Sequence, residues 1–122
     1  MIQGTVRVTG EAVIRVQFRG PTGVVANVDT VLDTGFTDEF CLAPWIIEKL
    51  GLPFKEEVHY ALADGSETVT RMFTADVYWM GHWREILVTE IDADPLAGMS
   101  LLRGCHVGMD VIDDGAIEIR PL

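Results

Sequence analysis

The residues best suited to chemistry are Asp33, Thr34 and Gly35, which directly follow the apolar pair Val31 and Leu32. An apolar strand that ends in an acid places a carboxylate at the edge of a sheet, where it can accept or donate a proton in general acid–base catalysis. By average residue usage, an Asp-Thr-Gly triplet arises by chance in roughly 2 of 100 chains of this length. The triplet therefore gains weight only from its surroundings.

The other candidate groups favour structural roles. The histidines are His59, His82 and His106, and they fall on separate predicted strands, which does not indicate a metal site. The acidic residues near the C-terminus lack the ligand spacing of a calcium loop. Cys41 and Cys105 lack a Cys-x-x-Cys partner, so we expect both to be small buried apolar side chains. We expect neither a metal nor a cofactor.

Turn signals recur at short intervals and predict an all-β chain. The Asp64-Gly65 dipeptide favours a hairpin, and Gly81 and Gly115 mark two more. The expected strands are Val6–Val8, Ala12–Phe18, Val24–Leu32, Val58–Leu62, Thr68–Phe73, Ala75–Trp79, Trp83–Val88, Val107–Ile112 and Ala116–Ile119. Proline at a first-turn position predicts two short helices, Pro44–Leu50 and Pro95–Leu102.

Length and charge limit the function classes. A chain of 122 residues with 48% hydrophobic residues is expected to form a single folded domain over residues 1–122. Its net charge of −10 argues against nucleic acid as a partner, because binding to phosphates needs clustered cations. No apolar run approaches the ~18 residues that span a bilayer, and the N-terminus lacks a signal-peptide layout. We therefore expect no membrane partner and a cytoplasmic location.

The surroundings of the triplet resemble those in single-domain retropepsin-like aspartic proteases, specifically the small prokaryotic branch in which Phe follows Asp-Thr-Gly. The resemblance spans nearly the whole chain. Its ordered matches are Asp33–Phe36, Leu42–Pro44 with the helix to Leu52, Leu62–Ser66 and Pro95–Leu102. It implies a mostly β, retropepsin-like acid-protease β-barrel that works as a homodimer.

The resemblance also implies an aspartic endopeptidase that hydrolyses peptide bonds in a peptide or protein substrate. Water would be activated between two Asp33 carboxylates, one from each subunit, because the sequence holds no second Asp-Thr-Gly or Asp-Ser-Gly. Thr34 hydroxyls would hydrogen-bond across the two-fold axis, and the Gly35 N–H would orient the carboxylate. Ala63, Asp64 and Gly65 would form the tip of a flap over the cleft.

In retropepsins the terminal strands of both subunits interleave, and here Met1–Val8 and Ala116–Leu122 would take that part. They would then be unpaired edges in a monomer. Two alternatives remain: a catalytically inactive dimeric module that binds peptides or regulates a partner, and a monomeric β-barrel for a small ligand.

Overall fold

The computed structural model describes residues 1–122. The fold is mostly β with two short helices, as predicted. The strands are β1 (Ile2–Val6), β2 (Ala12–Arg19), β3 (Val25–Leu32), β4 (Phe40–Leu42), β5 (Phe54–Ala61), β6 (Glu67–Trp79), β7 (His82–Glu90), β8 (Leu96–Ala97), β9 (Cys105–Met109) and β10 (Ala116–Pro121). The helices are α1 (Pro44–Leu50) and α2 (Met99–Leu102).

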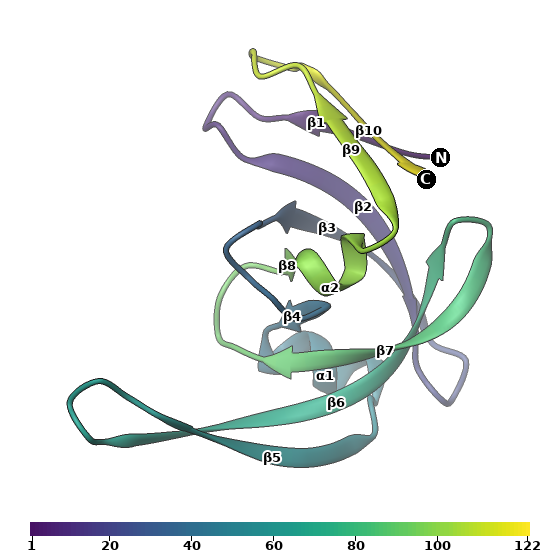
Figure 1. The fold of residues 1–122 in the computed structure, drawn as a ribbon. Helices are drawn as coiled ribbons and strands as arrows, with labels where there is room; N and C mark the ends of the chain where they lie inside the picture. Colours follow the sequence, from purple (N-terminus) through teal and green to yellow (C-terminus); the bar gives the residue numbers. More distant parts are fainter.

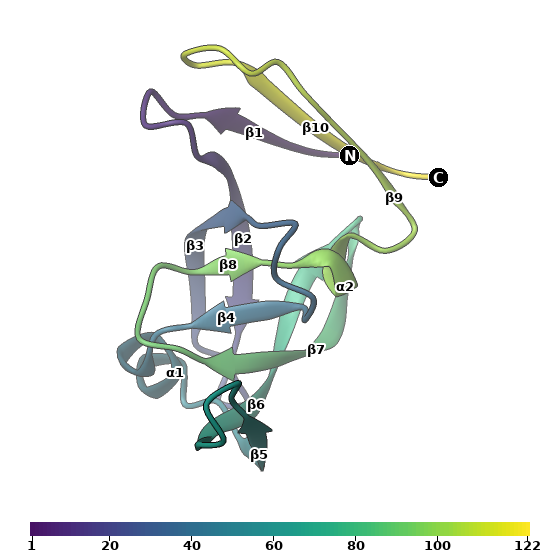
Figure 2. The ribbon, with the colours of Figure 1, turned by 60° about the vertical axis from the view of Figure 1, so that its left-hand side comes forward.

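Hydrogen-bonded neighbours form one sheet in the order β5-β6-β7-β4-β8-β3-β2-β1-β10-β9 (Figure 1). A further pairing of β6 with β2 closes the strands β2, β3, β8, β4, β7 and β6 into a ring. Within it, β8 lies between β3 and β4, parallel to β3 and antiparallel to β4 (Figure 2). Because β3 and β8 are parallel, the loop after Leu32 and the loop after Ala97 leave the ring at the same end.

The core fills this ring with the inward faces of its strands. Alternating residues of β2, namely Ile14, Val16 and Phe18, are buried, as the alternation of the sequence predicts. Phe18 packs edge-to-face on Phe40 at 4.9 Å between ring centroids. Burial of one such side chain contributes about 1.5–3 kcal/mol. Packing in this core fixes the position of the ends of β3 and β8, where the candidate site lies.

Helix α1 follows the prediction in both position and ends. Pro44 stands in its first turn, and Gly51 ends it in the left-handed conformation with φ of 62°. The N–H of Gly51 donates to the Glu48 carbonyl and the N–H of Leu52 to the Ile47 carbonyl, a pattern that a glycine in this conformation permits at helix ends. The buried side chains Ile46, Ile47 and Leu50 attach α1 to the core.

The terminal strands differ from the prediction. Strand β1 pairs with β10 of the same chain, from Ile2 opposite Ile119 to Thr5 opposite Ala116. The other edge of β10 pairs with β9, so the prediction that the termini are unpaired edges in a monomer is wrong. The free edge of this terminal sheet is β9 instead.

Other differences arise where sequence signals are local. The predicted helix Pro95–Leu102 is divided into β8 and the shorter α2, because Leu96 and Ala97 bond to β3 and β4. The two strands predicted within residues 68–79 form the single long strand β6. The strand predicted at Val6–Val8 ends at Val6, since residues 7–10 turn. None of the helices has the length and apolar character needed to span a bilayer.

Candidate active site

Asp33 lies at the point where β3 ends. Its N–H donates to the carbonyl of Ala97 at 2.9 Å, which continues the parallel pairing of β3 with β8 by one residue. Its own carbonyl accepts from the N–H of Phe36 at 3.1 Å, so the chain turns sharply at Thr34 and Gly35. The backbone of Asp33 is therefore held on both sides, and its half-buried side chain extends from a rigid strand end.

The Asp33 carboxylate is oriented by the glycine two residues later. The Gly35 N–H donates to Oδ1 of Asp33 at 2.8 Å. A Cβ atom at Gly35 would lie 3.1 Å from the same oxygen, which is tighter than ordinary contact. The N–H contact matches the role that the resemblance assigns to Gly35. Oδ2 of Asp33 has no hydrogen-bond partner within the chain.

The loop that follows the triplet is clamped from one side by the start of α2. The N–H groups of Gly98 and Met99 donate to the carbonyls of Glu39 and Phe36 at 2.9 and 2.8 Å. At Gly98 a Cβ atom would lie 2.6 Å from the Phe36 carbonyl oxygen, so only glycine permits this approach. The segment Pro95–Leu102 is one of the matches in the resemblance. Its hydrogen bonds to Phe36 and Glu39 show that it supports the loop that follows Asp33.

Strand β7 clamps the same loop from the other side. The Glu39 carboxylate accepts from the Arg84 guanidinium at 2.7 Å and from the N–H of Leu87 at 3.1 Å. Thr89 donates to Asp38 at 3.4 Å. Charge-assisted bonds of this kind are stronger than neutral ones. Sequence reasoning missed Glu39 and Arg84, since they lie far apart in the chain and only the β4–β7 pairing brings them together.

Asp33 and Thr34 line a cavity of about 640 Å³. The cavity lies on the side of the terminal sheet, which consists of β1, β10 and β9. Its walls are mainly apolar and come from the β3 end, α2 and β9. The lining residues include Leu32, Met99, Leu102, Cys105, Val107 and Met109. Met99 and Met109 remain 47% and 41% exposed, so the apolar wall is open to solvent in a single chain.

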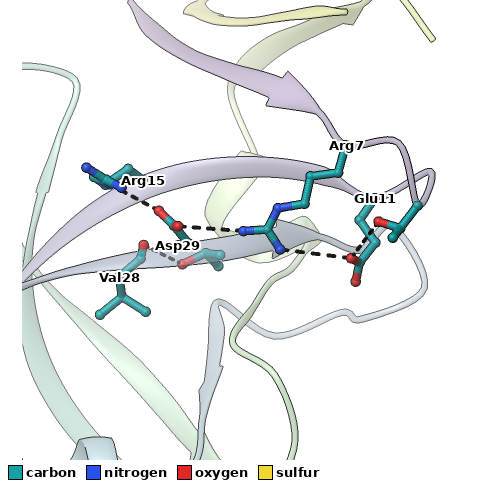
Figure 3. A network of polar contacts seen from close by, with 7 residues as sticks. Arg7, Glu11, Arg15, Val28 and Asp29 are labelled. Carbon is teal, nitrogen blue, oxygen red and sulfur yellow. Dashed lines mark hydrogen bonds and ion pairs between the residues drawn. The ribbon is translucent and has the colours of Figure 1, made fainter. Parts of the chain in front are cut away.

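Glu11 is the other carboxylate on this cavity, and it has its own partners. It accepts from Thr9 at 3.1 Å and lies 4.0 Å from Arg7. Arg7 in turn reaches Asp29 of β3 at 3.6 Å, and Arg15 holds Asp29 at 3.0 Å (Figure 3). Exposed pairs contribute little stability. They tie the turn before β2 to the strand that carries Asp33.

The residues predicted as a flap lie at the turn between β5 and β6. This hairpin projects from the ring, and its tip at Ala63, Asp64 and Gly65 is exposed (Figure 1). Gly65 adopts φ of 85°, as the Asp64-Gly65 turn signal predicts. No hydrogen bond joins the tip to Asp33, and the tip residues do not line the Asp33 cavity. Within one chain the structure therefore does not bring the two parts of the predicted site together.

Both cysteines are free, and they differ in burial. Cys41 is fully buried, as predicted, whereas Cys105 is only half-buried and lines the Asp33 cavity. Burial raises the pKa of the Cys41 thiol, and the nearby Asp33 carboxylate raises it further, against a lowering by a backbone hydrogen bond at Leu96. Cys41 is therefore a neutral thiol packed behind the Asp33 loop.

The raised pKa of Cys41 predicts that the protein loses stability in alkali. Above the ordinary thiol pKa of 9.0, the unfolded chain ionises Cys41 while the folded chain keeps it protonated. The free energy of unfolding should then fall by up to about 1.4 kcal/mol per pH unit until the folded thiol also ionises. Urea denaturation between pH 8 and 11 measures this slope. Cys41→Ala should reduce the slope and Cys105→Ala should leave it, whereas an equal slope in Cys41→Ala contradicts the assignment.

The order of the strands and the clamped loop at the end of β3 define a retropepsin-like fold. A solved structure described as a retropepsin-like aspartic protease from Rickettsia conorii superposes with a TM-score of 0.63, covering 99% of this chain and 90% of that one at 20% identity. No family model matches the sequence, and no curated protein does. The likeness is therefore one of fold, as the sequence resemblance implied.

Proposed function

We propose that the protein is a homodimeric aspartic endopeptidase in which Asp33 of each subunit supplies half of the catalytic pair. The observation that carries the proposal is the Asp33 carboxylate, held at a rigid strand end by the Gly35 N–H and facing an open cavity. The retropepsin-like fold supports it. So does the absence of a second carboxylate paired with Asp33 inside the chain, since one carboxyl group cannot act as base and acid at once.

The proposed chemistry follows from two carboxylates at short range. Like charges cannot both ionise cheaply when they are close, so the pair of Asp33 side chains shares one proton. The ionised member takes a proton from water, which attacks the scissile carbonyl carbon, and the protonated member gives its proton to the carbonyl oxygen. Titration then belongs to the pair rather than to either residue.

Neighbouring groups would complete the site in the dimer. Thr34 is exposed beside Asp33, where its hydroxyl is free to hydrogen-bond across the two-fold axis. The tip at Ala63, Asp64 and Gly65 would close over an extended peptide. The two free cysteines accord with a reducing compartment, and we propose a cytoplasmic location.

The proposal is tested by incubating the purified protein with a peptide library between about pH 4 and 7, where a shared-proton pair works. Mass spectrometry should show internal cleavage, and a statine-type mimic of the tetrahedral intermediate should block it. Tight binding of extended peptides without any cleavage identifies the alternative, a catalytically inactive peptide-binding module.

Asp64 predicts a charge preference of the flap. The Ser66 hydroxyl donates to Oδ1 of Asp64, as does the Ser66 N–H at 2.8 Å, and these bonds lower the pKa of Asp64. The carboxylate is therefore ionised at the working pH and should disfavour acidic substrates. Asp64→Asn keeps an acceptor for the Ser66 N–H and removes the charge.

The ratio of cleavage rates for a basic and an acidic version of one peptide should fall about fivefold in Asp64→Asn, because the substitution removes a negative charge that attracts the basic peptide and repels the acidic one. Asp113→Asn, in the exposed turn between β9 and β10, makes the same charge change elsewhere and should leave the ratio unaltered. An unchanged ratio in Asp64→Asn would show that Asp64 does not lie at the cleft.

A further inference from the structure

Strand β9 has one edge that the chain leaves open. It is the last strand of the sheet and pairs only with β10. The bonds from Asp110 N–H to Ala116 and from Leu122 N–H to Gly104 show that the even-numbered residues face β10. Neighbouring residues of an antiparallel strand bond to opposite sides. The N–H and C=O groups of Cys105, Val107 and Met109 therefore point to the open edge.

This edge adjoins the Asp33 cavity. The side chains of Cys105, Val107 and Met109 line the same cavity as Asp33 and Thr34. A strand that pairs with β9 would thus lie beside the cavity that Asp33 lines. An unpaired edge beside apolar side chains is a strong template for another strand.

The sequence of β9 is complementary to itself when two copies run antiparallel. With Gly108 opposite Gly108 of a second copy, Val107 meets Met109, and His106 meets Asp110. Gly108 has no positive φ, and in this register it would form the pair that approaches most closely, where its lack of a side chain would fit. His106 and Asp110 are both exposed in one chain. Arg120, opposite His106 on β10, would add a positive group near the Asp110 of the other copy.

We propose that a second copy of this chain docks by antiparallel pairing of β9 with β9, centred on Gly108, and so forms the dimer that completes the Asp33 site. This inference rests on the proposed function and specifies its interface. The interface is built from β9 rather than from interleaved termini, because β1 and β10 have already paired within the chain. Two His106–Asp110 contacts, related by the two-fold axis, select this register over its neighbours.

Single cysteines measure the register directly. In a Cys105→Ser background, Gly108→Cys places two thiols across the axis at a Cα separation of about 4.5 Å, within the range that a disulfide spans. A Cβ atom at Gly108 meets only the His106 ring, at 3.6 Å, so the substitution fits. Val107→Cys and Met109→Cys are the matched controls, because each would face itself only in a register shifted along the strand.

The expected result under mild oxidation is a covalent dimer of Gly108→Cys that forms about tenfold or more faster than that of either control, as pre-paired thiols require. Faster cross-linking at residue 107 or 109, or none at 108 in a protein that is dimeric and cleaves peptides, overturns the β9 register while leaving the proposed function intact. A protein that sediments as a 13.5 kDa monomer at high concentration overturns both. Cross-linking at residue 108 without cleavage of any peptide would support the β9 interface and contradict the proposed endopeptidase function.

Charge exchange gives an independent readout. His106→Asp opposes two acidic side chains at each end of the interface and should raise the dimer dissociation constant about tenfold, as two like-charged cross-strand pairs would. The double variant His106→Asp with Asp110→His should restore it. His82→Asp, at the first residue of β7, carries the same charge change and should leave the constant unchanged. No rescue in the double variant overturns the His106–Asp110 contact.

Discussion

Asp33→Asn is expected to abolish peptide cleavage, with a loss of kcat/KM of about 10²–10⁴-fold or more, the range that a general acid–base group contributes. An amide can neither accept a proton from water nor share one with a second carboxylate. The substitution keeps the Oδ1 acceptor for the Gly35 N–H, so the loop geometry should persist. The measurement is cleavage of a fluorogenic peptide, with thermal unfolding to show that the fold is retained.

Mixing the variant with the wild-type chain tests whether both subunits supply an Asp33. When equal amounts of variant and wild-type chain pair at random, only about a quarter of the dimers hold two Asp33 side chains. Activity should therefore be about a quarter of that measured when the same total amount of protein is all wild type. Activity of one half would instead show that each chain acts alone. Asp113→Asn, far along the chain in the turn before β10, is the matched control and should not lower activity in either format.

The parts of the fold that could be predicted from the sequence depend on local signals. The Asp64-Gly65 turn, the capping of α1 by Pro44 and Gly51, and the alternation of β2 each fix the conformation of a few neighbouring residues. The strand before Asp33 was predicted for the same reason. These signals therefore located the candidate carboxylate and the hairpin that carries the predicted flap.

The parts that could not be predicted depend on pairing between distant segments. Strands β4 and β8 have three and two residues, too short for a recognisable alternation, and they exist because each bonds to neighbours far away in the chain. The resemblance implied that the termini pair between subunits, yet Ile2 pairs with Ile119 in the same chain. That pairing also moves the open edge to β9, which no sequence pattern marked.

Gly98→Ala is expected to lower both the stability and the activity of the protein. A Cβ atom at this position would lie 2.2 Å from the Asp38 carbonyl oxygen and 2.6 Å from that of Phe36, closer than real side chains approach. The loop between Asp33 and β4 would have to move away from α2, breaking the bond from Gly98 N–H to Glu39. Overpacking of this kind costs about 1–3 kcal/mol and more where backbone must shift.

Activity should suffer beyond the loss of stability, because the same loop begins at Asp33. A displacement of about 1 Å in a catalytic group costs on the order of 10²-fold in rate, so kcat should drop by that factor at a temperature where the variant is fully folded. Gly23→Ala is the control: its φ of 87° is unsuited to alanine, but nothing lies within 4 Å of the added Cβ. It should lose about 1–2 kcal/mol to backbone strain and keep its kcat. If Gly98→Ala also keeps wild-type kcat while folded, the contact between α2 and the loop from Asp33 to β4 supports the fold alone and does not position Asp33.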